Sequence, residues 1–153
     1  MSGDPAVIKV LQAMLSAEAH LNMQYRLDWR ILKFMGVDKT AGKIKGLGKK
    51  AHTFQKIVTD RILFLGGDVE FGMPAITQVA PLTPILQHEL ELETALSDLA
   101  LKAIHTAVEA GDEDTAEKMR HIEERHEDAM GWLLQQLRLI AKVGEPNYIT
   151  EVM

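Results

Sequence analysis

The chain has 153 residues, a length typical of one domain that is large enough to bury a hydrophobic core. It contains no cysteine, which excludes disulfide bonds, thiolate metal sites and cysteine nucleophiles and fits a reducing compartment. Its net charge of −5 argues against nucleic acid as a partner. We see neither a secretion signal nor an apolar run long enough to span a bilayer, so we expect a cytoplasmic protein without a membrane partner.

Capping residues, prolines and glycines divide the chain into four long helical segments. Asp4 and Pro5 open the first segment, and Gly36 ends it. Glycines and prolines mark the later boundaries in the same way. The predicted helices cover residues 5–35, 38–65, 83–110 and 112–143, with a short terminal helix after residue 145.

The connection between the second and third segments, residues 66–84, is irregular and contains three prolines. Turns within helix bundles usually have about 2 to 8 residues, so this connection is long enough to cross the whole bundle. Short turns make the first two helices antiparallel, and likewise the last two, whereas the crossover makes helices two and three parallel. The pattern predicts an all-α, ferritin-like four-helix bundle in a single domain spanning residues 1–153.

Residues 123–126 read Glu-x-x-His, a spacing that puts a carboxylate and an imidazole on one face of a helix. Two such steps facing each other make a di-metal site in a four-helix bundle. The apolar residues of this helix, however, place His126 inside and leave Glu123 on the flank. We therefore interpret the step as coincidental and keep only His126 as a core-facing group.

Single polar residues interrupt the apolar faces of three of the helices. These residues are Glu18 in the first, Glu93 in the third and His126 in the fourth, whereas the second helix shows no polar residue on its core face. A buried carboxylate is normally protonated, paired or bound to metal. The three side chains form either a mononuclear metal site or, together with Tyr25, a hydrogen-bonded group that only fixes the packing of the core. The spacing of these residues in the sequence does not decide between the two.

Over nearly its whole length, the sequence resembles the bacterioferritin family. The resemblance rests on Gly3-Asp4, Glu18, Gln24-Tyr25, Trp132 and, most specifically, "RILFL" at residues 61–65. It implies a hollow oligomeric cage that oxidises ferrous iron at a di-iron centre inside each subunit and stores the ferric mineral. It also implies haem held between paired subunits.

The resemblance implies that Glu18 and Glu93 keep two ligand positions of the di-iron centre. Anchored on "RILFL", the Glu-x-x-His positions of the second helix are Ala51 and Phe54, which have no donor atoms. Anchored on Trp132, the matching positions of the fourth helix are His126 and Ala129. The resemblance therefore implies a degenerate ferroxidase centre with weak or absent activity.

The same alignment puts His52 at the position of the methionine that binds haem in the family. Histidine is an established axial haem ligand, so two symmetry-related His52 side chains are candidate ligands. The alternative is a surface histidine without a ligand.

Lysines crowd the first half of the second helix, and three glycines weaken it there. Their side chains form either a solvated basic face or a contact surface for something acidic. In the family's cage the flank of the first two helices lies near a two-fold contact, where two basic faces repel. This hints at a mixed shell rather than a homo-oligomer. The lysines are Lys39, Lys43, Lys45, Lys49, Lys50 and Lys56.

We thus expect an iron-storage subunit of a homo-oligomeric or mixed shell, with catalytic bacterioferritin subunits as partners in the mixed case. A second expectation is a mononuclear metal-binding oxidase or peroxide-consuming protein that uses Glu18, Glu93 and His126. The third is a haem-carrying electron-transfer subunit that uses His52.

Overall fold

The structure is a computed structural model that describes residues 3–70, 72 and 75–152, and within these ranges it contains helices and connections but no strand. None of the described helices combines the length and the apolar content needed to cross a bilayer. The helices are α1 (Pro5–Phe34), α2 (Asp38–Phe64), α3 (Thr83–Glu109), α4 (Glu113–Val143) and α5 (Glu145–Val152).

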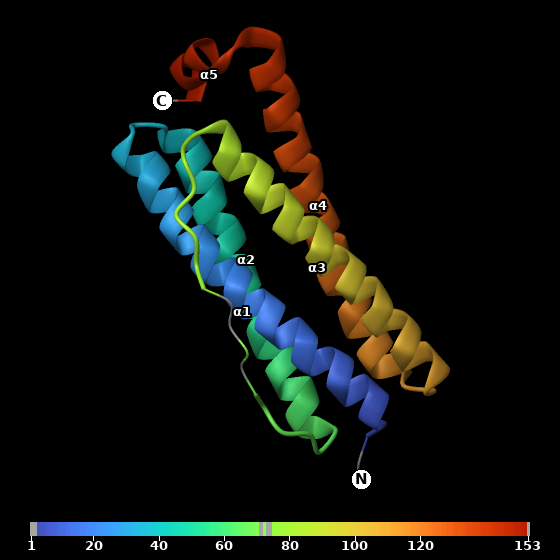
Figure 1. Cartoon of the computed structure of the whole chain (residues 1–153). Helices are drawn as coiled ribbons and strands as arrows, with labels where there is room; N and C mark the ends of the chain where they lie inside the picture. The colour runs from blue at the N-terminus through green and yellow to red at the C-terminus, as the bar shows by residue number, and fades with distance from the viewer. Residues whose placement is uncertain (1–2, 71, 73–74, 153) are drawn as a thin grey trace.

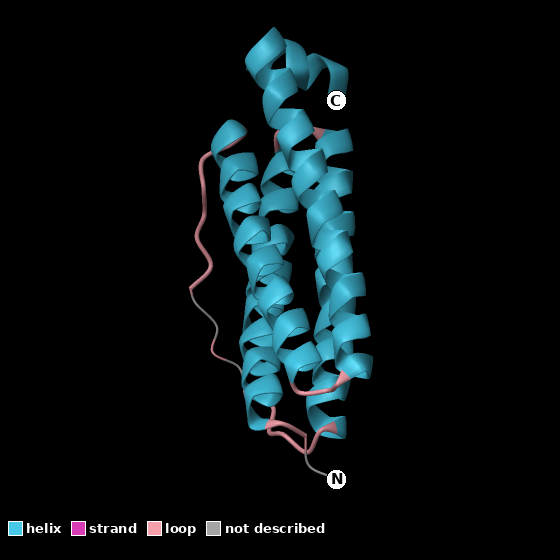
Figure 2. Ribbon diagram, turned by 90° about the vertical axis from the view of Figure 1, so that its right-hand side faces the viewer, coloured by secondary structure: helices cyan, strands magenta, loops and turns pink. Residues whose placement is uncertain are grey.

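The four long helices lie side by side, and the short α5 caps one end of them (Figure 1). Helix α1 runs toward that end and α2 returns from it, so these two are antiparallel. The connection after α2 then travels back along the outside of the bundle, so that α3 runs in the direction of α2 (Figure 2). The predicted all-α, ferritin-like bundle, with one long crossover and a C-terminal helix, is confirmed.

Local chemistry explains why the helices begin and end where they do. The Asp4 side chain accepts a hydrogen bond from the backbone N–H of Ala6 at 2.8 Å, and Pro5 occupies the first helical position of α1. After α1 the backbone of Gly36 adopts φ of 84°, a left-handed conformation that glycine reaches without a steric penalty. The helix boundaries predicted from these residues agree with the structure to within about two residues.

The crossover is fastened to one face of α1 by three polar side chains. Gln12 donates to the carbonyl of Asp68 at 2.8 Å, and Ser16 accepts from the backbone N–H of Gly72 at 3.1 Å. Gln24 both donates to Thr77 O at 2.8 Å and accepts from Thr77 N at 3.2 Å. Because these α1 residues are spaced by multiples of four, they share one side of the helix.

Helix α2 buries two polar residues, so the expectation that its core face is purely apolar is wrong. Arg61 is 8% exposed; its Nε donates to Thr115 Oγ1 at 2.7 Å and its guanidinium pairs with Asp112 at 3.1 Å. Asp112 also caps α4, so one carboxylate joins the end of α2 to the start of α4. Thr40, 2% exposed, contacts the hydroxyl of Tyr148 from α5 at 2.9 Å.

Candidate functional site

The three polar residues predicted to face the core meet at one level of the bundle. Glu18 from α1, Glu93 from α3 and His126 from α4 are each 2% exposed or less. The Nδ1 atom of His126 lies 2.6 Å from Glu93 Oε2, and its Nε2 atom is hydrogen-bonded to Glu18 Oε1. The imidazole ring is therefore held between two carboxylates that come from two different helices.

Two aromatic rings complete the surroundings of this triad. The hydroxyl of Tyr25 donates to the second oxygen of Glu93. On the α2 side, the Phe54 ring meets the His126 ring edge-on, with centroids 5.3 Å apart. Ala51 of α2 and Ala129 of α4 are buried as well, and neither side chain carries a donor atom.

The protonation of His126 explains how the carboxylates of Glu18 and Glu93 can both be buried. Burial lowers the pKa of His126, but its hydrogen bonds to Glu18 and Glu93 outweigh this effect and raise the pKa to about 10. Burial raises the pKa of Glu18 to about 7, against the opposing effect of the His126 hydrogen bond. At neutral pH the ring is therefore an imidazolium, and both of its nitrogens donate.

The donor set does not fit the di-iron centre implied by the resemblance. Both nitrogens of His126 are engaged by carboxylates, so neither is free to bind an ion. Ala51, Phe54 and Ala129 supply no donor. Among the residues that the structure describes, no group of three or more His, Asp or Glu side chains is arranged to hold a metal ion. One oxygen, Glu18 Oε2, is buried without a hydrogen-bond partner.

Glu123, the first residue of the Glu-x-x-His step, does not join this triad. It lies at the margin of the core, 9% exposed, and accepts a hydrogen bond from Ser97 of α3 at 2.8 Å. Its side chain is thus committed to α3 rather than to an ion shared with His126. This position agrees with the flank predicted from the helical period.

A second buried acidic cluster, which was not predicted from the sequence, lies between α1 and α3. Asp28 of α1 and Glu89 of α3 are both fully buried. Gln24 donates to Asp28 Oδ1 at 3.0 Å, while Asp28 Oδ2 and both oxygens of Glu89 have no donor when ionised. The signal was present in the sequence, because Glu89 stands one helical turn before Glu93 and Asp28 stands three residues after Tyr25.

The Asp28 and Glu89 pair is stable only when it holds a proton. Burial raises the pKa of Glu89 well above its ordinary value, and the neighbouring charge of Asp28 raises it further. Protonated Glu89 donates to Asp28, which supplies the missing hydrogen bond. We call Asp28 and Glu89 the carboxyl pair, and Glu18, Glu93 and His126 the imidazole triad.

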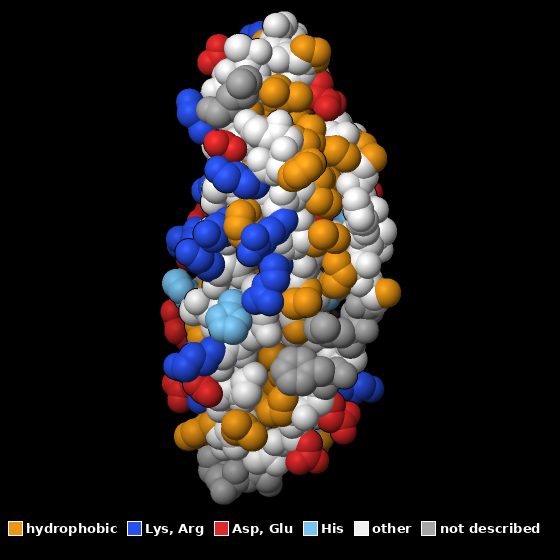
Figure 3. All heavy atoms as spheres, turned by 90° about the vertical axis from the view of Figure 1, so that its left-hand side faces the viewer, with side chains coloured by type: hydrophobic (Ala, Val, Ile, Leu, Met, Phe, Trp, Pro, Cys, Tyr) orange, Lys and Arg blue, Asp and Glu red, His pale blue; other side chains and the backbone are white. Residues whose placement is uncertain are grey.

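His52 is not part of the triad and lies on the exposed outer side of α2. It borders a groove of about 630 Å³ between α1 and α2. Figure 3 shows lysine and arginine side chains gathered on this side of the molecule, with a histidine beside them. A haem role for His52 stays a prediction. The residues that line the groove are Asn22, Arg26, Trp29, Arg30, Lys45, Gly48, Lys49, His52 and Thr53.

The lysines of α2 do not form one continuous face. Lys45 lies over the Trp29 ring of α1, 4.8 Å from its centroid, whereas Lys43 lies over the Trp132 ring of α4 at 5.7 Å. Lys39 instead donates to a backbone carbonyl of α5 at 3.3 Å. Only the lysines on the α1 side belong to the groove beside His52.

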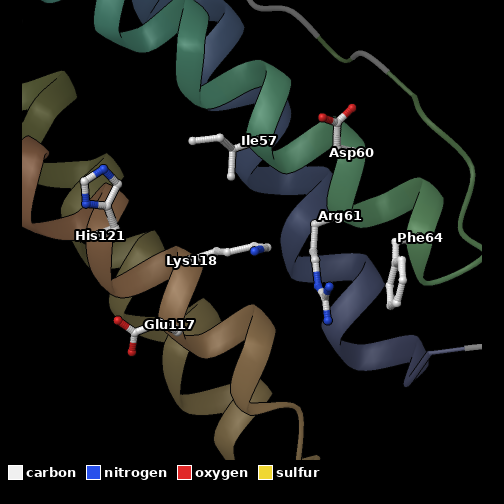
Figure 4. A pocket seen from close by; sticks show the side chains of 7 residues that line it. All are labelled: Ile57, Asp60, Arg61, Phe64, Glu117, Lys118 and His121. Carbon is white, nitrogen blue, oxygen red and sulfur yellow. The ribbon is translucent and has the colours of Figure 1, made fainter.

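Another groove, of about 590 Å³, lies between α2 and α4. Its carboxylates and its histidine point in different directions (Figure 4). Since they do not converge on one point, we assign no binding site there. The lining residues are Ile57, Asp60, Arg61, Phe64, Glu117, Lys118 and His121.

Comparison with known proteins finds similarity to ferritins over nearly the whole chain. A family model described as a ferritin-like domain matches residues 8–143. The chain is 30% identical over 149 residues to a bacterial ferritin of Neisseria meningitidis serogroup B, with 97% of each chain covered. It is 29% identical over 154 residues to a bacterioferritin of Streptomyces coelicolor, covering 100% of this chain and 92% of the relative. A bacterial ferritin of Synechocystis is 26% identical over 155 residues.

Proposed function

The chain belongs to the ferritin-like family, and within it to the bacterioferritins, and on this premise we propose that it is an iron-storage subunit whose own ferroxidase centre is inactive. Its place is in a cytoplasmic oligomeric cage, with iron as the stored cargo. Oxidation of that iron falls to catalytic subunits in a mixed shell, or proceeds slowly at the inner surface of a homo-oligomer.

The observation that carries the proposal is the imidazole triad. A di-iron site of this architecture takes one glutamate from each of two helices and a Glu-x-x-His from each of the other two. Helices α1 and α3 keep their glutamates, Glu18 and Glu93. Helix α2 offers Ala51 and Phe54 instead of donors, and α4 offers Ala129 in place of a histidine.

The triad also explains how the bundle stays folded without metal. Two carboxylates that face each other in a core repel unless a positive charge lies between them. The imidazolium of His126 supplies that charge, and it is bonded to one carboxylate on each side. The position that an iron ion takes in a working centre is thus neutralised by a side chain.

Two alternative functions predict different measurements on the purified protein. A mononuclear oxidase or peroxide-consuming protein using Glu18, Glu93 and His126 retains stoichiometric metal in elemental analysis. An electron-transfer subunit with haem on His52 shows a Soret band. We expect neither result from the protein produced alone, because no observation on the described residues favours these functions.

The direct test is ferrous oxidation at an iron loading too low for mineral growth. We expect the wild type to oxidise iron at the slow rate of buffer and surface, and Glu18→Ala to leave this rate unchanged. Absorbance of the ferric product against time gives both rates. Rapid oxidation by the wild type that disappears in Glu18→Ala would show that the centre is active and end the proposal.

A complementary experiment restores the missing metal-binding side chains and looks for a gain of ferrous oxidation. The variant that combines Ala51→Glu, Phe54→His, His126→Glu and Ala129→His presents the donor set of a di-iron bundle. We expect it to oxidise iron far faster than the wild type. The control carries Ala51→Glu and Phe54→His alone, which keeps the imidazolium between the two carboxylates and is expected to stay slow.

A further inference from the structure

We propose that the crossover carries a pH-sensitive latch, which holds it against α1 while the carboxyl pair is protonated and releases it when the pair ionises. The latch consists of Gln24 on α1, Thr77 in the crossover, and the carboxyl pair of Asp28 and Glu89. Figure 2 shows this crossover lying along the outside of the bundle. Because the latch lies outside the imidazole triad, it operates whether or not the ferroxidase centre is active.

The side-chain amide of Gln24 joins the crossover to the carboxyl pair. Its nitrogen donates to Asp28 Oδ1 at 3.0 Å and to the Thr77 carbonyl at 2.8 Å. Its oxygen accepts from the Thr77 backbone N–H at 3.2 Å. A primary amide has two N–H donors, and both are in use here. A further bond from Gln24 to a carboxylate therefore has to replace an existing one.

The carboxyl pair has too few donors to carry two charges. Asp28 and Glu89 are fully buried, and Asp28 Oδ2 and both Glu89 oxygens have no partner among the residues that the structure describes. While Glu89 is protonated, its own O–H donates to Asp28. Once Glu89 ionises, two buried carboxylates face each other, which is unfavourable unless they gain hydrogen bonds. Ionisation therefore leaves oxygens that have to find N–H or water donors.

The other titratable groups around the pair do not supply these donors. Glu93, one turn along α3, adds a negative charge that raises the pKa of Glu89. The hydroxyl of Tyr25 on α1 is already bonded to Glu93. His88 of α3 lies close enough for its charge to lower the pKa of Asp28, but a histidine is uncharged at alkaline pH. The amide already bonded to the pair is thus the donor that responds.

The charge on the pair decides which acceptor Gln24 binds. Hydrogen bonds to an ionised acceptor are roughly twice as strong as those between neutral groups. An ionised pair therefore draws the second N–H of Gln24 away from the neutral Thr77 carbonyl. Residues 75–82 of the crossover include no charged side chain or histidine that could hold this segment to the pair instead. Turning the amide breaks both bonds to Thr77, and water then reaches the carboxylates.

The direction of the pH dependence follows from where the proton is held. Burial raises the pKa of Glu89 well above its ordinary value, and the charge of Asp28 raises it further. Opening the latch admits water and weakens both effects, so the open form binds this proton less tightly. The closed form is therefore fully stabilised at low pH and loses this stabilisation as the pH rises.

Hydrogen exchange of single backbone amides tests the latch directly. The Thr77 N–H donates to Gln24, whereas the Gly72 N–H of the same crossover donates to the uncharged Ser16 hydroxyl at 3.1 Å. Mass spectrometry with electron-transfer fragmentation distinguishes the two amides in the full, iron-free protein. After correction for the intrinsic effect of pH on exchange, we expect protection at Thr77 to fall roughly tenfold between pH 6 and pH 9. Protection at Gly72 should change by less than about twofold.

Glu89→Gln removes the ionisation and keeps a side chain that donates to Asp28, as the protonated carboxyl does. We expect protection at Thr77 to become independent of pH in this variant. Glu91→Gln, the same change at an exposed position of α3, is the matched control and should behave as the wild type. The proposal is wrong if Thr77 loses no protection in the wild type, if Glu89→Gln loses as much as the wild type, or if Gly72 loses as much as Thr77.

A second variant approaches the pair from α1. Asp28→Asn removes the charge that faces Glu89, so protection at Thr77 should change by less than about twofold between pH 6 and pH 9. It replaces Glu89→Gln if that variant loses its helical circular dichroism, and an undiminished fall in Asp28→Asn would equally end the proposal. All of these measurements are made without iron. Rapid ferrous oxidation by the wild type would therefore end the proposed function and leave the result for the latch unchanged.

Discussion

The imidazole triad and the carboxyl pair both bury carboxylates from α1 and α3, and they offset the repulsion between these carboxylates in different ways. In the triad, His126 places a positive charge between Glu18 and Glu93. In the carboxyl pair, Asp28 and Glu89 face each other with no cation, and a proton on Glu89 takes that place. The charge of His126 persists until the imidazolium titrates, whereas the carboxyl pair depends on Glu89 staying protonated.

The comparison shows why only the triad is tied to the lost catalytic centre. Both of its carboxylates are bonded to His126, and Phe54, one of the substituted residues, packs against the imidazole ring. The carboxyl pair instead borders the crossover, because Gln24 bonds to both Asp28 and Thr77. The two clusters thus contact different parts of the fold, although only one helical turn separates Glu89 from Glu93.

The largest expected effect comes from removing the cation of the triad. His126→Leu leaves Glu18 and Glu93 facing each other, so we expect a loss of about 3 to 5 kcal/mol in the free energy of unfolding at pH 8. Urea unfolding at a fixed protein concentration measures this loss. In a Glu18→Gln/Glu93→Gln background the same substitution should cost much less, and an equal cost in both backgrounds would mean that His126 acts only by packing.

A glutamate-to-glutamine substitution is expected to change the free energy of unfolding in opposite directions in the two clusters. Glu89→Gln mimics the protonated carboxyl and should raise the free energy of unfolding at pH 8 by about 1 to 3 kcal/mol. Glu93→Gln, its matched control, should lower it, because the imidazolium then loses a charged partner. If both variants are destabilised to the same extent, the two clusters do not differ in the way described.

The pH dependence of the wild type sharpens the comparison further. The folded state holds protons that the unfolded chain releases, because the pKa of Glu89 is raised above 4.5 and that of His126 is raised from 6.5 to about 10. The contribution of His126 is complete below pH 6.5 and disappears as the pH rises toward 10, and that of Glu89 declines above pH 4.5. We expect the free energy of unfolding, measured with urea, to fall between pH 6 and 9 by about 3 kcal/mol from His126 alone. Glu89→Gln should flatten the early part of this fall, and an unchanged slope would contradict the assignment of the proton.

The smallest expected effect concerns Tyr25, whose hydroxyl bonds to the triad at Glu93. Tyr25→Phe removes the hydrogen bond that its hydroxyl donates to Glu93, so we expect a loss of about 1 kcal/mol. The His126 hydrogen bonds should survive, and the pH dependence of unfolding should keep its shape. Thermal unfolding followed by circular dichroism at pH 6 and pH 9 checks both expectations.

The sequence was sufficient for the helices and for the triad because both follow from local chemistry. Prolines, caps and glycines mark each helix end, and the helical period alone brings Glu18, Glu93 and His126 to their core faces. The buried Arg61 was not predicted, since its partner Asp112 is distant in sequence and a charged residue beside an apolar face normally lies in solvent. The carboxyl pair was missed for a related reason, because Glu89 alternates with Leu90 at the edge of an apolar stripe.

The attachment of the crossover to α1 has a consequence for the order of assembly. The partners of this segment at Gln12, Ser16 and Gln24 all precede it in the chain. During synthesis all partners of these contacts therefore leave the ribosome before the second hairpin does. By its contacts the crossover belongs to the early half of the protein, and α3 then packs against α1 of that half.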